Sequence, residues 1–522
     1  MSPIIFLFLA FMSVVYLIYI LLPKKARPYC LLISSLVFYA VYSKFMTAFL
    51  LATIVTIYLG GVILNKLEGQ FQTQKEGLDK EQRKALKEKF KRKKKLAVAL
   101  IVVFNVAILA VLKYFNFFGS LLEGFLGWFN VSATVPVLKL VLPLGISYYT
   151  LSAIGYLVDV YRGKHKGGNF LEVALFISYF PQLFEGPFAT FEKLTPQLMA
   201  GEGFNPTNFF NGALSVLWGF FKTVVVADRL AIVVSAVFAN YSTYNGLVIV
   251  IGIVLFTFQL YAEFSGMIDV ASGISEMFGI KLAKNFEQPF FSQTVTEFWR
   301  RWHISLGTWL REYIFYPISM SKGFMKMNKK LQGKVTSFLQ VLIPSSIALF
   351  VVWFVNGIWH GAELKYIVYG LYYYVLTMAG MCLEQLRNLI YNKTKINKDH
   401  VALKILRIVR TFILVNIGML IFRASDLGVA INMFDQIFKG GSINLIAENV
   451  IDVPDTIMAV LGLILVVGYD VLKECKIDLR EKVTNSHLAL KYATLLVFIV
   501  VIILFGAYGD GYIAPDPIYG GF

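Results

Sequence analysis

Two histidines stand in polar, aromatic-rich stretches of a chain that is otherwise mostly aliphatic. His303 lies in EFWRRWHISLGTWLREYIFYP (Glu297–Pro317), and His360 lies in FVNGIWHGAELKYIVYGLYYY (Phe354–Tyr374). An imidazole can accept and return a proton near neutral pH, as general acid–base catalysis requires. Both histidines are therefore candidate catalytic residues.

His360 is the stronger candidate because of its backbone setting. Gly357 and Gly361 bracket Ile-Trp-His, and glycines on both sides permit a tight bend. This setting predicts that His360 is presented at a helix break, where a substrate can reach it. No nucleophile elbow, P-loop, dinucleotide fingerprint or set of metal ligands accompanies the histidines. The pattern indicates group transfer through a general base, with an acceptor hydroxyl as the nucleophile.

The first stretch also carries charges that could position a donor. On one continuous helix, Arg300 and Arg311 would share a face, and His303 would lie on a neighbouring stripe. Glu297 can pair with Arg300 or Arg301 at helical spacing. Guanidinium groups bind phosphates well, so we expect the three arginines to attract the phosphates of a donor. The alternative is an amphipathic helix that lies at the membrane surface.

A third polar stretch is YAEFSGMIDVASGISEMFGIKL (Tyr261–Leu282). Helical spacing places Ser265 and Asp269 on one face, and Gly266 and Gly273 on a neighbouring face that would let another helix approach closely. Ionisable groups are costly inside a bilayer, so Asp269 is a functional candidate. A hydrogen-bonded packing residue is the alternative.

The elements that hold these residues are expected to be membrane helices. The chain has 522 residues, of which 57% are hydrophobic and 16% charged, with a mean hydropathy of +0.66. Apolar runs such as Pro3–Leu22 and Leu488–Phe505 approach the ~20 residues that cross a bilayer as a helix. Composition predicts an all-α, polytopic membrane protein with 11–13 spans, because lipid leaves open strand edges unsatisfied.

The net charge of +17 is distributed in clusters between the apolar runs. Between Lys66 and Lys95 there are twelve Lys and Arg residues. The positive-inside rule explains such clusters as cytosolic loops that contact anionic lipid, which argues against nucleic-acid binding. An acidic cytosolic partner for this region remains open. The alternation of clusters predicts a multi-pass protein of the cell membrane with both termini outside.

We expect one integral membrane domain over residues 1–522. It would comprise N-terminal helices (1–64), a basic cytosolic loop (65–95), a catalytic helical core (96–508) and an extracytoplasmic tail (509–522). Within the core, FISYFPQLFEGPF (Phe176–Phe188) is interrupted by proline and glycine. Non-helical backbone at membrane depth must be buried in protein or line a cavity, so we predict a re-entrant segment.

Three stretches resemble the bacterial membrane-bound O-acyltransferase family. They are FSGMIDVASGISEMFGI, NFEQPFFSQTVTEFWRRWHISLGTWLREYIFYPI and NGIWHGAELKYIVYGLYYY. The resemblance covers most of the chain from about Pro143 on. It implies a ring of helices, with re-entrant or half helices, around a central funnel. It also implies that His360 is catalytic in a tunnel joining the two faces and that His303 lies close by. The supporting residues that we expect are Glu297, Asp269, Asn356 and Trp359.

The resemblance further implies an acyl thioester donor on the cytosolic side, either acetyl-CoA or an acyl-carrier protein, and no tightly bound cofactor. The acyl group would leave on an envelope polymer outside. TEFWRRWHISL (Thr296–Leu306) favours the alginate O-acetyltransferase branch, whereas LKYIVYGLYYY (Leu364–Tyr374) leans toward the branch that transfers D-alanine to teichoic acid. We favour acetyl transfer to an exopolysaccharide or cell-wall glycan.

The C-terminal PIYGGF is similar to an F-x-Y-x-x-F ending of this family or its small partners, with Pro517 in place of the first aromatic residue. This similarity implies that Tyr519 carries the acyl group after activation by His360. The ester would then pass to an SGNH-type extracytoplasmic acyltransferase or to the polymer. The alternative is a tail whose aromatic residues pack on the surface.

Two non-enzymatic interpretations are open. A transporter or flippase would also use broken helices and buried charges, and a scaffold for an envelope-synthesis complex is a third possibility. The two histidine motifs count against both.

Overall fold

The computed structural model describes residues 3–132, 134–138, 142–183, 185–395, 397–443 and 453–508. Within these ranges the regular structure is helical, apart from an isolated bridge between Tyr244 and Ser442. Eight helical segments there are long and apolar enough to cross a membrane: Lys24–Gln74, Lys80–Gly127, Gly246–Met277, Ser337–His360, Leu364–Thr394, Val401–Arg423, Pro454–Glu474 and Leu488–Phe505. The predicted all-α membrane architecture is confirmed.

The number of crossings differs from the number of these segments. The segment Lys24–Gln74 has 51 residues, more than twice the ~20 that one crossing needs. Two shorter apolar helices, Leu7–Leu21 and Phe170–Leu183, add to the eight. The count of 11–13 spans stays a prediction.

The chain divides into two compact units. One consists mainly of Leu7–Phe209 with Ile274–Leu282, and the other of Phe210–Gly273 with the chain from Ala283 onward. Both histidine motifs and Asp269 therefore belong to the second unit.

The first unit contains short and long helices in succession. They are η1 (Lys24–Ala26), α2 (Arg27–Ser43), η2 (Lys44–Met46), α3 (Thr47–Gln74), α4 (Lys80–Gly127), α5 (Ile146–Arg162), α6 (Phe170–Ser178), α7 (Phe180–Leu183) and α8 (Phe191–Ala200). Three further helices run across the boundary between the units: α1 (Pro3–Leu21), α9 (Pro206–Phe220) and α11 (Gly246–Met277).

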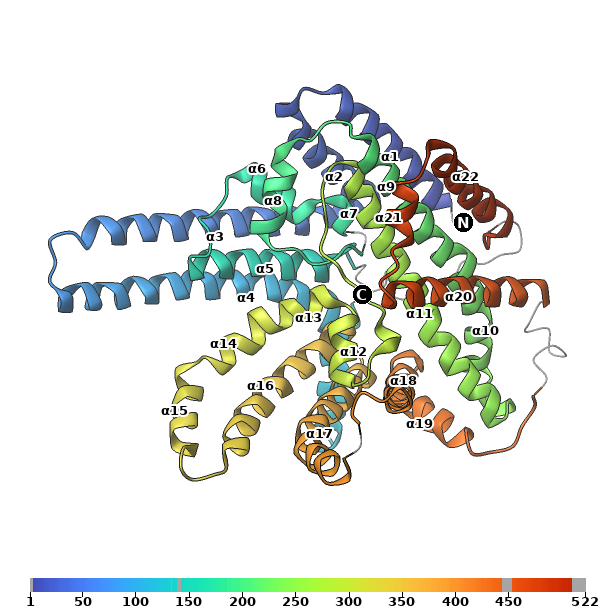
Figure 1. The fold of residues 1–522 in the computed structure, drawn as a ribbon. Coiled ribbons are helices and arrows are strands. Elements are labelled where there is room, and N and C mark those ends of the chain that lie inside the picture. Colours follow the sequence, from blue (N-terminus) through green and yellow to red (C-terminus); the bar gives the residue numbers. More distant parts are fainter. Residues whose placement is uncertain are drawn as a thin grey trace. The chain divides into compact units, whose positions relative to one another are not determined.

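The basic region at 65–95 is mostly helical, with a turn at residues 75–79. Helices α3 and α4 lie side by side and antiparallel, and they project as a long hairpin (Figure 1). Asp79 begins α4 with a capping box, because its side chain accepts from the Gln82 backbone while the Gln82 side chain accepts from the Asp79 backbone. Lys, Glu, Gln and Ala are strong helix formers, so the charged sequence continues the helix into solvent. The expected boundaries at 64/65 and 95/96 fall inside helices.

The segment predicted to be re-entrant is broken, as its sequence indicates. Helix α6 ends at Ser178, Tyr179 has a non-helical backbone, and α7 covers only four residues. Glu185 has φ 96° and is 8% exposed. The Gln182 side-chain amide donates to the Pro187 carbonyl at 2.7 Å. This bond gives a partner to a backbone carbonyl that lies outside any helix.

The second unit holds the remaining elements. They are η3 (Phe221–Ala227), α10 (Asp228–Ala239), η4 (Tyr241–Thr243), η5 (Pro289–Phe291), α12 (Val295–Arg301), α13 (Ile304–Leu310), η6 (Arg311–Phe315), α14 (Tyr316–Ser319), α15 (Lys322–Leu331), α16 (Ser337–His360), α17 (Leu364–Thr394), α18 (Val401–Arg423), α19 (Leu427–Gln436), α20 (Val453–Glu474), α21 (Leu479–Thr484) and α22 (Leu488–Phe505).

Glycines let α9 and α11 approach each other closely, as the sequence predicts. A Cβ at Gly266 would lie 2.8 Å from the Gly219 carbonyl oxygen, and one at Gly273 would lie 2.5 Å from the Gly212 carbonyl oxygen. Contacts this short leave no room for a side chain, so backbone packs on backbone. The close approach continues into the π-helical segment η3, where Thr223 faces Gly266.

Helices α16 and α17 form a hairpin that closes at His360. Helix α16 ends at His360, and α17 begins four residues later, which confirms the predicted helix break. A Cβ at Gly357 would lie 2.4 Å from the Tyr366 carbonyl oxygen, and one at Gly370 would lie 2.3 Å from the Trp353 carbonyl oxygen. Small residues on both helices therefore hold the end of α16 against the first turns of α17.

Candidate active site

The helix that we expected through His303 is interrupted at that residue. Helix α12 ends at Arg301 and α13 begins at Ile304, while His303 itself adopts a left-handed conformation with φ 47° and ψ 50°. The prediction of one continuous helical stripe is wrong. Its physical reason lies in Asn285, whose backbone carbonyl accepts from the Ile304 N–H at 3.0 Å and replaces a helical bond at the break.

Asn285 also fixes the orientation of the His303 ring. Its Oδ1 accepts from the Ser305 backbone at 3.1 Å and from the Ser305 hydroxyl at 2.7 Å, and lies 3.2 Å from His303 Nδ1. The backbone donor identifies this atom as the amide oxygen, which only accepts, so Nδ1 carries the proton and Nε2 does not. Burial lowers the pKa of His303 to about 3. The ring is therefore neutral at physiological pH.

His360 lies among aromatic rings. Its side chain is 2% exposed, and its ring centroid lies 5.6 Å from that of Tyr369 in α17 and 5.3 Å from that of Phe422 in α18, both nearly perpendicular. Edge-to-face packing of this kind orients a ring and excludes water. His360 is therefore enclosed by protein, with α17 and α18 packed against the end of its own helix, α16.

Trp359 connects the two histidines. Its ring centroid lies 5.8 Å from that of His303 and 5.0 Å from that of His360. The imidazoles can be no farther apart than the sum of these two distances. All five histidines of the chain lie within the described residues, and His303 and His360 are the two that are buried. The structure thus brings together the two residues that the sequence singled out.

A cavity of about 400 Å³ lies beside His303. Asn356 of α16 lies on its wall and is 3% exposed, and Arg300 and Arg311 lie on its more exposed side. His360 follows Asn356 by one helical turn and is not among the residues that line this cavity. The cavity is in the size range of small-molecule sites, and it combines two cations with an apolar interior.

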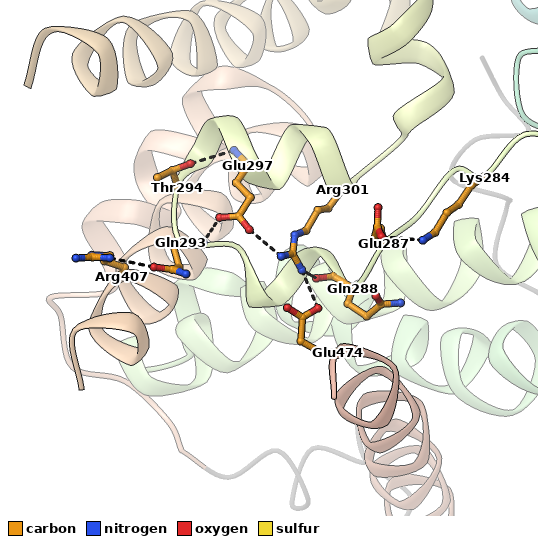
Figure 2. A network of polar contacts seen from close by, with 9 residues as sticks. All are labelled: Lys284, Glu287, Gln288, Gln293, Thr294, Glu297, Arg301, Arg407 and Glu474. Carbon is orange, nitrogen blue, oxygen red and sulfur yellow. Dashed lines mark hydrogen bonds and ion pairs between the residues drawn. The ribbon is translucent and has the colours of Figure 1, made fainter. Parts of the chain in front are cut away.

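Arg301 belongs to a different environment from Arg300. Its guanidinium pairs with Glu297 at 2.8 Å and with Glu474 of α20 at 2.9 Å (Figure 2). Burial acts to lower the pKa of Arg301, but the hydrogen bond and charge of Glu474, with Glu297, raise it above its ordinary value. Arg301 therefore ties α12 to the end of α20, and its charge is already neutralised.

Glu297 also stabilises the start of α12. The Thr294 hydroxyl accepts from the Glu297 backbone at 3.0 Å, and the Glu297 carboxylate accepts from the Gln293 backbone at 2.9 Å. The Gln293 side chain in turn accepts from Arg407 of α18 (Figure 2). This network holds α12, and with it the cavity wall, in place. Trp302, which directly follows α12, is 1% exposed and therefore packs inside the protein.

Asp269 pairs with a buried lysine that the sequence analysis did not select. Lys222 of η3 is 4% exposed, lies 2.8 Å from the Asp269 carboxylate and donates to the Ser265 hydroxyl at 2.8 Å. The predicted shared face of Ser265 and Asp269 is confirmed. The pair lies away from the residues that line the His303 cavity, so in this structure Asp269 neutralises a lysine inside the helical core.

Two residues that matter for the geometry, Asn285 and Lys222, were missed as individual sites. Asn285 begins one of the three stretches that carried the family resemblance, whereas Lys222 lies outside them. Asn285 precedes His303 by 18 residues, so no helical or turn spacing connects them. The signal that could have identified Lys222 is a lone cation inside an apolar run, which a bilayer penalises unless it is paired. Tyr519 lies outside the described residues.

Comparison with known proteins gives consistent matches. Residues 36–409 match the model of the membrane-bound O-acyltransferase family. A probable alginate O-acetylase of Pseudomonas syringae pv. tomato is 35% identical over 65% of this chain and 60% of its own length. A peptidoglycan O-acetyltransferase of Helicobacter pylori is 30% identical over 65% and 64%. A teichoic acid D-alanyltransferase of Bacillus subtilis is 28% identical over 45% and 57%.

Proposed function

Because this chain belongs to the membrane-bound O-acyltransferase family, we propose that it transfers an acetyl group from a thioester donor to a hydroxyl of an extracellular or envelope polysaccharide. The two more similar relatives described above bear names of O-acetyl transfer to glycan polymers. The relative named for D-alanyl transfer matches at lower identity and over less of the chain. Acetyl is therefore the group that we favour.

The observation that carries the proposal is the pair of buried imidazoles that both contact the Trp359 ring. In the proposed reaction, the His360 imidazole takes the proton of an acceptor hydroxyl while its oxygen attacks the thioester carbonyl. The carbon–sulfur bond breaks, and the leaving thiolate receives that proton as the tetrahedral intermediate collapses. No redox partner or metal is needed for this balance.

His303 does not suit the role of base, and we assign that role to His360. A general base works best when its pKa lies near the operating pH, and burial lowers the pKa of His303 to about 3. His303 would instead act as a neutral ring whose Nδ1–H is held by Asn285. In that role it positions Trp359 and the reacting groups without taking up a proton.

The cavity beside His303 would receive the donor. Arg300 and Arg311 lie on its exposed side, where they would attract the phosphates of coenzyme A or of a carrier-protein arm. The thioester end would extend along α16 past Asn356 toward His360, one helical turn farther on. This assigns donor binding to Arg300 and Arg311 and a supporting role to Arg301.

We also propose a role for the C-terminal tail in receiving the acyl group. Tyr519 would accept the acyl group as an ester and pass it to an extracytoplasmic acyltransferase or to the polymer. Mass spectrometry of the C-terminal peptide reports this directly, through the mass of the added group and its site. An acylated Tyr519 in the wild type and an unmodified peptide in His360→Ala supports the relay, whereas polymer acetylation that persists in Tyr519→Phe overturns it.

The test of the function is acyl transfer in membranes from cells that express the full chain. We expect His360→Ala to reduce transfer from labelled acetyl-CoA, or from an acylated carrier protein, by at least 100-fold. The control is His400→Asn, which alters an exposed histidine but keeps a side chain able to cap α18. Equal amounts of folded protein are verified by size-exclusion chromatography in detergent.

Full activity in His360→Ala would overturn the proposed base. Substrate that crosses the membrane without any acyl chemistry would favour a transporter instead. The mass of the transferred group decides between acetyl and D-alanyl donors.

A further inference from the structure

A second and larger cavity, of about 840 Å³, lies in the same unit and is distinct from the His303 cavity. Its walls come from α20 and α22, with contributions from α9, η3 and α21. Most of the lining is apolar, as with Ile464, Leu465 and Val497. These three side chains are also 59–60% exposed, so the cavity opens on the face that the two membrane helices turn toward lipid.

The two helices and α21, which lies between them in the chain, are tied to neighbouring helices. At one end, Arg229 of α10 pairs with Asp455 at the start of α20 and donates to the Phe505 carbonyl at the end of α22 at 2.7 Å. At the other end, Thr484 of α21 donates to the Asn211 side chain at 2.6 Å. The cavity is therefore part of a braced arrangement rather than a gap between loosely packed helices.

An aromatic cluster forms the inner wall. The Trp218 ring lies 4.9 Å from that of Tyr469 in α20, 6.0 Å from that of Phe498 in α22 and 5.4 Å from that of Phe221 in η3. Trp218 thereby contacts both membrane helices and closes the inner side. Because the apolar cavity opens toward lipid, a hydrocarbon chain of the bilayer can enter and fill it.

The charged groups of the cavity are at one end of α20. Lys473 in its last turn and Arg480 of α21 lie on the cavity wall, both half-buried. Lys473 lies over the Tyr469 ring at 4.7 Å, and among the described residues no carboxylate is within ion-pair distance of its ammonium. Asp269 also lines the cavity, but Lys222 already pairs with it. The cavity thus joins an apolar chamber to a cationic end.

We propose that this cavity binds one anionic phospholipid. Its phosphate lies between Lys473 and Arg480, and an acyl chain occupies the space between α20 and α22 against Trp218. The basic residues around this end, including Lys476 and Lys491, are typical of the cytosolic side of a membrane, where anionic headgroups attract them. The bound lipid would brace two helices that, in the described residues, do not fill the space between them.

This site does not depend on acyl transfer, and its test measures lipid binding alone. The full-length protein is purified in detergent, supplied with phosphatidylglycerol or phosphatidylcholine, and analysed by native mass spectrometry. We expect the wild type to retain one phosphatidylglycerol in preference to phosphatidylcholine. Because each cation near an anionic lipid contributes about 1 kcal/mol, the double variant Lys473→Gln/Arg480→Gln should bind phosphatidylglycerol about 30-fold more weakly.

A second variant tests the chamber without altering charge. Gly468 lines the cavity, and a Cβ built there meets no atom within 4 Å, so Gly468→Trp can fill the space without displacing backbone. We expect this variant to keep its thermal stability and lose the retained lipid. The matched control for the double variant Lys473→Gln/Arg480→Gln is Lys476→Gln, which removes an exposed charge near the same end of α20 but outside the cavity.

Equal retention of phosphatidylglycerol in the wild type and in Gly468→Trp would overturn the proposal. Retention of the two lipids without preference by the wild type, or an equal loss in Lys476→Gln and the double variant, would overturn the assignment of the phosphate to Lys473 and Arg480.

Discussion

The two buried histidines have the same side chain and opposite surroundings. His303 is held by one amide oxygen through a backbone break, and His360 is held by the faces and edges of aromatic rings. A polar contact at Nδ1 fixes the tautomer of His303. Ring packing against Tyr369 and Phe422 fixes the position of the His360 ring. This difference underlies the roles that we assign to them.

The low pKa of His303 predicts a pH dependence of stability. Between its ordinary pKa of 6.5 and its pKa of about 3 in the folded protein, the unfolded chain binds a proton that the folded chain does not. Stability is therefore lost as pH falls below 6.5, by about 2 kcal/mol at pH 5. We expect the melting temperature of the wild type in detergent to fall more from pH 7 to pH 5 than that of His303→Gln. Parallel declines would contradict the buried neutral ring.

Arg300 and Arg301 are adjacent in sequence, but we expect their substitution to have different effects. Arg301→Gln removes two ion pairs and should lower stability by about 1 kcal/mol, discounted for partial exposure. Arg300→Gln should leave the melting temperature unchanged and raise the donor KM about tenfold, as for loss of one charge-assisted contact. Thermal unfolding and steady-state kinetics of both variants check this. The reverse pattern would mean that Arg301 holds the donor.

At the scale of the elements, the candidate site depends on where helices stop. His360 is at the end of α16, and His303 lies between α12 and α13. A side chain at a helix end is not confined to the stripe that faces a neighbouring helix, so it can face a cavity. Glycines hold the end of α16 against α17, and Trp359 of α16 contacts the rings of both His303 and His360.

The close approach of α9 and α11 gives a prediction at this scale. A methyl group at Gly273 would lie 2.5 Å from a backbone oxygen, so Gly273→Ala must separate the helices and should cost about 1–3 kcal/mol. The control is Gly380→Ala in α17, where a Cβ meets no atom within 4 Å and helix propensity favours alanine. Melting temperatures in detergent compare the two. An equal effect would show that the glycine contact is not needed.

At the scale of the whole molecule, the apolar surface and the charge clusters determine insertion. Helices α20 and α22 expose many aliphatic side chains along their length, which is stable only in lipid. The basic clusters then select the orientation of each span. We infer that the hairpin of α3 and α4 and the turn between α20 and α21 lie on the cytosolic side.

Native cysteines test this orientation. Cys382 of α17 and Cys475 after α20 are exposed, while Cys30 is buried. Both exposed thiols lie near basic clusters, so a membrane-impermeant maleimide should label them in inverted vesicles and not in intact cells. Labelling of Cys475 in intact cells would contradict the inferred orientation. A cysteine introduced after Phe522 should show the opposite pattern.

The sequence by itself determined the class of the protein and its helical membrane character, and it singled out the two histidines that the structure buries beside Trp359. Those features are local: apolar run length, charge clusters and glycine-flanked motifs act within a few turns of chain. The break at His303 could not be predicted, because the Asn285 that stabilises it is 18 residues away and competes with a sequence that otherwise favours continuous helix.

Only the tertiary structure decided which neighbours pair. Arg300 and Arg301 have the same chemistry in sequence, but Glu474, far along the chain, reaches only one of them. The sequence predicted Asp269 to be a buried acid, but its partner Lys222 lies on another helix and could not be identified from the local pattern. Long-range pairing depends on packing that no local pattern encodes, so the sequence identified the candidate residues and the fold determined which partners each of them has.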